Sequence, residues 1–405
     1  MARKLPRLRT NLEFMPSPVA GRPGLLIRDS FQYSDATMIV PPLLAECLHL
    51  FDGEGTDLDL RQKLVGLTGD LRVGDIEEHL VDSLSKAGFL QDEVYERLRQ
   101  ERHAAFEDAR VRAASHAGSA YPTEPGELKA TLERYMCDGQ APAARQGALA
   151  GIAAPHVSPE GVLATYQAAY RALRAEDAER TFVILGTSHY GEPERFGLTR
   201  KAFATPLGEA ETNLALVNRL AEEAGAAVQM EDYCHAIEHS IEFQVVFLQH
   251  LYGPRVRIVP ILCGSYARSI YEGGRPEYNE NVRRFLGALG EMAAREGERL
   301  LWVLGIDLAH MGRRYGDQFA AAAGRGQMTA VAARDQARIG CVKEGDAEGF
   351  WERVQEHHDD LKWCGSAPLY TFLKAVPQAR GELLRYQQWN IDEQSVVSFA
   401  AMAFR

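Results

Sequence analysis

The sequence lacks the features that would place it in a membrane or outside the cell. No apolar run approaches the ~20 residues that a membrane-spanning helix needs. The basic residues within positions 1–6 are not followed by the apolar segment of a secretory signal. The six cysteines are scattered without a Cys-x-x-Cys pair, which is typical of free thiols in a reducing compartment. We therefore expect a cytoplasmic protein with no membrane partner.

Several common catalytic and binding motifs are also missing. The chain has no GxGxxG dinucleotide fingerprint, no GxxxxGK[ST] phosphate loop, no GxSxG nucleophile elbow and no HExxH zinc motif. Its net charge of −11 argues against a nucleic-acid partner. With 46% hydrophobic and 25% charged residues over 405 residues, the composition is that of a globular protein of two or three domains.

What the sequence does contain is a set of apolar segments that each lead into a histidine. They are residues 151–154 before His156, residues 182–185 before His189, and residues 300–304 before Asp307 and His310. Each segment has the length of a buried strand. In α/β sheets, ligands bind in the crevice outside the carboxyl ends of the strands. We expect these imidazoles to meet there and to form a metal or acid/base site.

The distribution of strand-like and helix-like segments predicts two domains. Residues 1–98 contain two short strands, three helices and a short return strand, an order that predicts a small winged-helix-like α+β domain. A charged segment at 99–111 predicts a connecting helix. Over residues 112–405 strands and helices alternate, which predicts an α/β domain with a mixed sheet flanked by helices.

A series of short motifs in the second domain resembles one known family. The motifs are Ser-His-Ala-Gly-Ser-Ala-Tyr-Pro from Ser115, Ala-Pro-His ending at His156, Leu-Gly-Thr-Ser-His ending at His189, Glu-His-Ser-Ile-Glu from Glu238, Asp-Leu-Ala-His from Asp307, and Cys364-Gly365. Their order from about residue 112 to the C-terminus is similar to that of the Memo family. That family is similar in fold to the class III extradiol ring-cleaving dioxygenases. The resemblance implies that His156, His189 and Cys364 hold a metal ion, with Asp307 and His310 beside it as acid/base groups.

The chemistry of these donors limits the choice of metal. Imidazole together with a thiolate favours iron, copper or zinc over magnesium or calcium. Three protein ligands leave positions open for water, oxygen or substrate. We expect Fe(II), with copper or zinc as alternatives. The extradiol dioxygenases use a carboxylate where this chain has Cys364, so ring cleavage itself is not implied.

Other interpretations of these residues remain open. A histidine at a strand end can simply cap the strand, and Cys364 alone can be a small buried apolar residue. His235, His239 and Glu242 have the spacing of one helical face and could form a rival metal site. We interpret His239 and Glu242 instead as residues that line the pocket, and we count them with Asp307 and His310 as candidate catalytic residues.

The first domain resembles the PqqD-like peptide-recognition fold, on the weaker motifs of residues 25–35, 51–53 and 87–90. This resemblance implies an exposed strand edge that captures an extended peptide as an added strand. The combined hypothesis is an iron-dependent oxidoreductase or oxygenase that acts on a peptide or small-molecule substrate. The alternatives are a peptide-binding adaptor that retains the pocket without turnover, and a hydrolase that uses zinc-bound water.

Overall fold

The computed structural model describes residues 2–137 and 148–405. The chain forms two compact units, Met1–Asp108 and Ala109–Arg405. The helix that we expected to connect them is α4 (Glu93–Asp108), and it belongs to the first unit. The reason is local, because Arg102 donates to Asp35 at 2.6 Å and His103 lies 3.2 Å from the hydroxyl of Tyr33.

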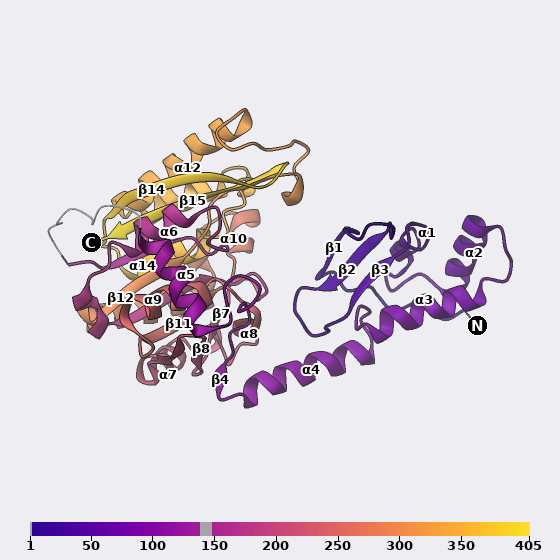
Figure 1. The fold of residues 1–405 in the computed structure, drawn as a ribbon, viewed down its shortest axis with the longest axis horizontal. Helices are drawn as coiled ribbons and strands as arrows, with labels where there is room; N and C mark the ends of the chain where they lie inside the picture. The colour runs from indigo at the N-terminus through magenta and orange to yellow at the C-terminus, as the bar shows by residue number, and fades with distance from the viewer. Residues whose placement is uncertain (1, 138–147) are drawn as a thin grey trace. The chain divides into compact units, whose positions relative to one another are not determined.

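The first unit is a three-stranded antiparallel sheet with helices after it (Figure 1). Its elements are β1 (Leu12–Pro16), β2 (Leu25–Asp29), β3 (Thr37–Val40), α1 (Pro42–Ala45), α2 (Asp57–Thr68), α3 (Gly74–Lys86) and α4. A capping box between Thr56 and Asp59 starts α2. The return strand expected at residues 89–90 is only an isolated bridge between Leu90 and Leu8, and β3 takes the place of a third strand.

The first unit has its own hydrophobic core. Leu60 of α2 and Leu80 and Leu84 of α3 are buried in it, as their helical spacing requires. An ion pair between Arg9 and Asp29, with side chains 1% and 0% exposed, lies within the same unit. A charged pair at that depth needs good geometry, and here the two guanidinium nitrogens donate to the two carboxylate oxygens at 2.9 and 2.8 Å.

The second unit is built on a mixed sheet of twelve strands flanked by helices (Figure 1). The strands are β4 (Val111–Arg112), β5 (Gly151–Ala154), β6 (Thr181–Thr187), β7 (Phe196–Leu198), β8 (Ala202–Thr205), β9 (Gly208–Thr212), β10 (Val228–Met230), β11 (Arg257–Cys263), β12 (Leu300–Gly305), β13 (His310–Gly312), β14 (Gly381–Asp392) and β15 (Ser395–Phe404). The order along the sheet is β13-β15-β5-β12-β6-β11-β9-β8-β4, with β14 paired to β15. The central strands β5, β12, β6 and β11 are parallel, whereas β15 runs antiparallel to β5.

Helices cover both faces of this sheet. They are α5 (Pro125–Cys137), α6 (Leu163–Tyr170), α7 (Leu214–Ala224), α8 (Cys234–Ile237), α9 (Glu242–Tyr252), α10 (Ala267–Glu272), α11 (Glu280–Glu296), α12 (Gln327–Glu344), α13 (Ala347–Gln355) and α14 (Ser366–Ala375). Phe182 and Ile184 of β6 pack with α6 and α9, while Val183 and Leu185 pack with α7, α11 and α14. This two-sided burial explains why β6 is apolar without alternation. Within the described residues, no helix combines the length and apolar character needed to cross a membrane.

Candidate metal centre

The parallel strands bring the predicted residues to one edge of the sheet. β5 ends at Ala154, β6 ends at Thr187 and β12 ends at Gly305. The second residue after the end of each strand is a predicted site residue: His156 after β5, His189 after β6 and Asp307 after β12. Because β12 lies between β5 and β6, the three positions are neighbours across the sheet. The equal offset after parallel strands therefore delivers these side chains to the same crevice.

Three imidazoles converge at that edge. The potential ligand atoms of His156, His189 and His239 all lie within 4.8 Å of one another. The ring centroids of His156 and His189 are 5.1 Å apart, and the ring of His239 stacks on that of His189 at 5.1 Å with an interplanar angle of 9°. Burial lowers the pKa of His239 well below its usual value, which keeps the ring in the neutral form that binds metals.

A thiol completes the group. The Sγ of Cys364 lies 3.4 Å from Nε2 of His156 and 3.5 Å from the carbonyl oxygen of Asp307. Burial opposes ionisation of this thiol, but its interactions with His156 and with His189 bring the pKa of Cys364 below the ordinary value. A cysteine that ionises readily is suited to bind a metal ion.

Glycine at the residue after Cys364 allows this placement. A Cβ added to Gly365 would lie 2.7 Å from Cβ of Ile306 and 2.8 Å from the carbonyl oxygen of Asp307. The N–H of Gly365 donates to that same carbonyl at 3.1 Å. The chain can therefore pass close to the end of β12, with Cys364 facing the imidazoles, only without a side chain at position 365.

Asp307 and His310 lie on the same side of the centre. The Oδ1 of Asp307 accepts from the backbone N–H of His156 at 3.0 Å, and its Oδ2 lies 3.5 Å from Nε2 of that ring. Burial raises the pKa of Asp307 to about 6, against the attraction of His310. Burial also lowers the pKa of His310, whose Nδ1 lies 2.9 Å from the carbonyl oxygen of Leu308.

Comparison with known proteins identifies the family to which this arrangement belongs. Residues 112–403 match the family model of the Memo-like proteins. The chain belongs to the Memo family. It is 26% identical over 384 residues to a MEMO1 family protein of Aquifex aeolicus, covering 94% of this chain and 95% of that protein. It is 30% identical over 306 residues to a MEMO1 family protein of Thermococcus kodakarensis, covering 73% of this chain and 99% of that protein.

A solved structure adds little to this comparison. An uncharacterized protein from Escherichia coli K12 overlays on 63% of this chain and 99% of its own, with a TM-score of 0.39 and 11% identity. That likeness is too low to support an argument about the fold or the site. The family assignment rests on the sequence relationships of the Memo-like unit.

The candidate ligand rings of the Memo-like unit are oriented by buried partners. His156 donates through Nδ1 to the carbonyl oxygen of Gly305 at 2.8 Å, which leaves Nε2 for the centre. The Nδ1 of His189 lies 3.1 Å from both carboxylate oxygens of Glu238. Such contacts on the second ring nitrogen fix the tautomer and the direction of a metal-binding histidine.

Glu238 is a functional residue that the sequence reasoning did not select. It is 1% exposed, and its carboxylate also accepts from the backbone N–H groups of His239 and Ser240 at 2.9 and 3.1 Å. Burial opposes its ionisation, yet the facing His189 holds the pKa of Glu238 well below the usual range. The sequence feature that could have identified Glu238 is its position in the Glu-His-Ser-Ile-Glu motif, beside a candidate ligand.

Two strand-end glycines let the segment that carries His239 approach the sheet. A Cβ on Gly186 would lie 2.5 Å from Oγ of Ser240, and a Cβ on Gly305 would lie 2.2 Å from the carbonyl oxygen of the same residue. The hydroxyl of Ser240 in turn donates to the carbonyl of Thr187 at 2.9 Å. The glycines after the apolar runs thus place His239 above the other two rings.

The single helical face that was the alternative interpretation of His235, His239 and Glu242 does not form. Helix α8 ends at Ile237, Glu238 has an extended backbone, and α9 begins only at Glu242. The ring of His235 faces Phe203, with centroids 6.0 Å apart, and burial lowers its pKa to about 4. The break between α8 and α9 separates the three side chains, so the rival metal site is not built.

Glu242 holds the start of the Memo-like unit, and its carboxylate lies 3.2 Å from Nδ1 of His116. Its fully buried carboxylate accepts from the guanidinium of Arg112, the hydroxyl of Tyr121, and the backbone N–H groups of Ser115 and His116 at 3.2 and 3.0 Å. Burial opposes ionisation, but Arg112 and these donors hold the pKa of Glu242 below its ordinary value. It therefore positions His116, whose ring lies 5.5 Å from that of His239.

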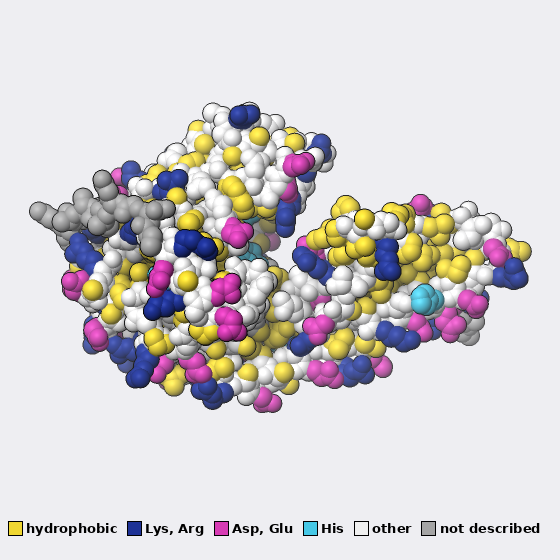
Figure 2. Space-filling model, in the orientation of Figure 1, with side chains coloured by type: hydrophobic (Ala, Val, Ile, Leu, Met, Phe, Trp, Pro, Cys, Tyr) yellow, Lys and Arg dark blue, Asp and Glu magenta, His cyan; other side chains and the backbone are white. Residues whose placement is uncertain are grey.

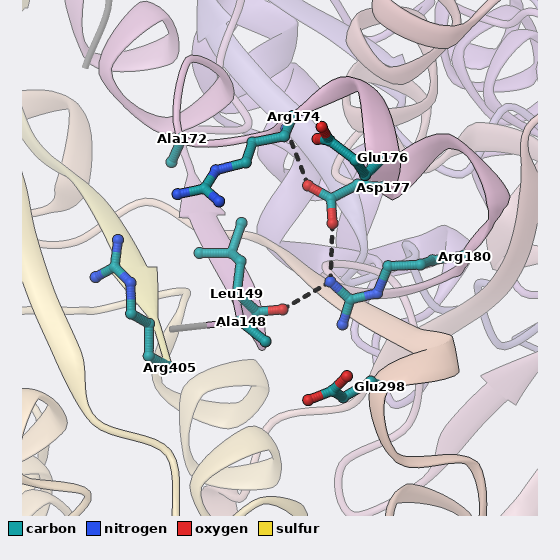
Figure 3. Close-up of a pocket in the computed structure, with 9 residues that line it drawn as sticks. All are labelled: Ala148, Leu149, Ala172, Arg174, Glu176, Asp177, Arg180, Glu298 and Arg405. Carbon is teal, nitrogen blue, oxygen red and sulfur yellow. Dashed lines mark hydrogen bonds and ion pairs between the residues drawn. The ribbon is translucent and has the colours of Figure 1, made fainter. Parts of the chain in front are cut away.

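A cavity of the Memo-like unit lies at the opposite ends of the strands, away from the imidazoles. Its volume is about 350 Å³, and Figure 3 shows the arginine and carboxylate side chains around it. Arg180, just before β6, donates to the carbonyl oxygen of Leu149 at 2.7 Å and to Asp177 at 2.9 Å. The guanidinium of Arg180 therefore donates hydrogen bonds to backbone and carboxylate groups of the protein itself. The residues that line this cavity include no histidine and no cysteine.

Proposed function

We propose that this Memo-family chain is an iron-dependent oxidoreductase whose metal is held by His156, His189 and Cys364. The observation that carries the proposal is the convergence of two strand-end imidazoles and a thiol of lowered pKa, with a third imidazole from His239 close by. These donors fit iron, copper or zinc, and they disfavour the oxygen-seeking magnesium and calcium ions. A bound iron(II) ion would supply one-electron chemistry and activation of oxygen.

The residues of the chain have distinct tasks in this proposal. Asp307, with a pKa of about 6, can hold a proton on its carboxylate near neutral pH and release it. His310 is tied through Nδ1 to backbone carbonyls at Leu308 and Lys362, so its Nε2 is the atom that exchanges a proton. Glu238 orients His189, and Glu242 orients the loop that carries His116. His239 borders the space in which substrate would lie.

A peptide substrate is the second part of the proposal, and it depends on the first unit. Strand β3 pairs only with β2 within the described residues, so its other edge offers free backbone groups. Figure 2 shows hydrophobic side chains gathered around the sheet of this unit, and Phe14, Val19 and Leu43 are exposed there. An extended peptide could add to such an edge with apolar side chains against this surface.

The coverage of the relatives indicates that the first unit is an addition to the Memo-like unit. The match to the Aquifex protein covers 94% of this chain, whereas the match to the Thermococcus protein covers 73% of this chain and 99% of that protein. The Memo-like unit thus makes up nearly the whole of the second relative. We propose that the metal centre is the common function and that peptide capture is specific to chains with the extra unit. A reducing compartment such as the cytoplasm suits the free thiols of Cys47, Cys234, Cys263, Cys341 and Cys364.

Metal analysis of anaerobically purified protein tests the centre. We expect about one iron per chain in the wild type, and loss of most of it in His189→Ala and in Cys364→Ala, while the control Cys341→Ala retains it. Zinc in place of iron would favour the hydrolase, and a metal-free wild type that cannot be loaded would favour the adaptor. Oxygen consumption with candidate peptides then separates an enzyme from a binding protein.

A further inference from the structure

A cavity of about 310 Å³ opens beside the metal centre. It shares His189 and Cys364 with the centre and extends from them toward the start of α14 and the aromatic residues Tyr266 and Trp351. Small-molecule sites begin at about 300 Å³, so the space suits a compact molecule or a single side chain. It lies on the reactive side of the sheet, unlike the cavity in Figure 3.

The start of α14 offers hydrogen-bond donors to this cavity. The helix has ten residues, begins at Ser366, and has no side-chain cap at Gly365. The first N–H groups of a helix have no acceptor within the helix, and the helix dipole makes this end favourable for anions. In α14 the N–H of Ser366 donates to the carbonyl oxygen of Trp363 at 3.2 Å and Pro368 has no N–H, so the N–H of Ala367 is the donor left for a ligand. Both properties point to a negatively charged group at this end of the cavity.

The side chain of Ser366 is an independent indication of a ligand. Ser366 lines the cavity, is 4% exposed, and its hydroxyl oxygen has no hydrogen-bond partner within the described part of the chain. A buried hydroxyl without a partner is unfavourable, and most such groups in proteins are satisfied. A ligand oxygen near the start of α14 would give this hydroxyl an acceptor.

The charged residues around the cavity are compatible with a single added negative charge. Asp359 lines it, but its carboxylate is paired with Arg338 at 2.6 Å. Lys362 also lines it and contributes a cation, whose Nζ lies 2.8 Å from Asp317. A dianion would meet the carboxylate of Asp359 and the thiol of Cys364, whereas a monoanion needs only the hydroxyl of Ser366 and the N–H of Ala367.

We propose that this cavity binds a small carboxylate group, held by the hydroxyl of Ser366 and the N–H of Ala367 in the first turn of α14, with its apolar carbons toward Tyr266 and Trp351. The carboxylate belongs either to a free organic acid or to an acidic side chain of a peptide. That the bound molecule is the substrate rests on the proposed function, because the cavity adjoins the metal ligands. The binding of a carboxylate does not depend on the metal.

Titration calorimetry on the metal-free full-length chain tests the proposal. The probes are butyrate for the free acid and N-acetylglutamate N-methylamide for the peptide side chain, each with its neutral amide, butyramide or N-acetylglutamine N-methylamide. We expect the carboxylates to bind at least tenfold more tightly than the amides. The stronger of the two carboxylates identifies the source, and either result supports the site.

Variants of the chain locate the binding. Ser366→Ala should weaken the carboxylate about tenfold, as expected for loss of one hydrogen bond to a charged group. Ser366→Thr, which keeps a hydroxyl, should bind within about threefold of the wild type, and the control Ser85→Ala in the first unit should bind as the wild type does. Lys362→Met provides a second variant, with an expected loss of severalfold.

Three outcomes would overturn the proposal: no binding of either carboxylate, equal binding of acids and amides, or carboxylate affinities unchanged in both Ser366→Ala and Lys362→Met. Circular dichroism confirms that each variant is folded. Since the titration uses protein without metal, a failure here is distinct from a failure of the iron analysis. If the chain binds carboxylates but no metal, the carboxylate site is supported, and only the proposal that its ligand is the substrate of an oxidoreductase is lost.

Discussion

At the scale of single residues, the geometry of the candidate metal centre depends on groups that are not among its proposed ligands. Glu238 fixes His189 and the start of the segment that carries His239, while Gly305 leaves the room for that segment. The sequence indicated His156 and His189 because each follows an apolar strand. It did not indicate Glu238, because a carboxylate next to a histidine is common on protein surfaces and only the fold buries this one.

Glu238→Gln tests the role of the carboxylate in orienting His189. The amide keeps the size of the side chain but loses the charge that His189 faces, so we expect metal affinity to fall about 10- to 100-fold. Competition with a chromophoric chelator measures the affinity, and the exposed Glu211→Gln serves as the control. An affinity equal to that of the wild type would show that Glu238 only shapes the loop.

Gly305→Ala tests the close approach of the segment above β12. The added methyl group would lie 2.2 Å from the carbonyl oxygen of Ser240, so either the strand end or the segment must shift. We expect a loss of about 1–3 kcal/mol in the free energy of unfolding, as for other overpacked sites, together with weaker metal binding. The matched control is Gly287→Ala in α11, where an added Cβ meets no atom within 4 Å and should not destabilise the fold. Urea denaturation of the two variants makes the comparison, and equal stabilities would contradict the expected clash.

At the scale of elements, the strands were more predictable than the connections between them. The apolar segments at residues 182–185 and 300–304 correspond to β6 and β12, because strands buried on both faces must be apolar throughout. The break between α8 and α9 was not predictable, since the spacing of His235, His239 and Glu242 fits an unbroken helix equally well. The contact of Ser240 with two strands, which is a tertiary contact, decides against that helix.

The start of α9 should make the stability of the Memo-like unit sensitive to acid. The pKa of Glu242 is lower in the folded chain than its ordinary value of 4.5, so this residue stabilises the fold above about pH 4.5. That stabilisation is lost as the pH falls through the lower, folded value. We expect the free energy of unfolding to decrease below about pH 4.5 in the wild type and to depend less on pH in Glu242→Gln.

At neutral pH the same variant should be less stable by about 3–5 kcal/mol, because Arg112 is left as a buried charge without its partner. Urea denaturation at several pH values measures both effects. A Glu242→Gln variant with the same pH dependence as the wild type would show that other carboxylates cause the acid sensitivity.

At the scale of the whole molecule, the sequence predicted two domains joined by a segment at residues 99–111, and the two compact units divide within that segment, between Asp108 and Ala109. The charged segment before residue 112 predicted a connecting helix, whereas α4 packs with the first unit through Arg102 and His103. Surface charge on a helix does not reveal which side it packs against. Similarly, two of the three strands of the first unit were expected, and β3 was missed because residues 37–40 are too short to give a clear alternation.

The two units should respond separately to damage in their cores. Leu84 and Leu289 are both fully buried, the first in the core of α2 and α3 and the second in the core around α11. We expect each leucine-to-alanine variant to lose about 2–5 kcal/mol in its own unit. Hydrogen exchange should then show reduced protection in the first unit for Leu84→Ala, with metal affinity unchanged, and in the second unit for Leu289→Ala. Loss of protection in both units of either variant would mean that they unfold as one.

The junction between Asp108 and Ala109, just before β4, has a consequence for how this architecture can change. The first unit leads into β4, which is the last strand in the order of the large sheet, whereas β5, β12 and β6 occupy the interior of that order. Material appended ahead of an edge strand leaves the hydrogen bonding of the inner strands intact. Evolution can therefore exchange the leading unit without rebuilding the strands behind it, and a protein engineer can fuse a different domain at the same boundary.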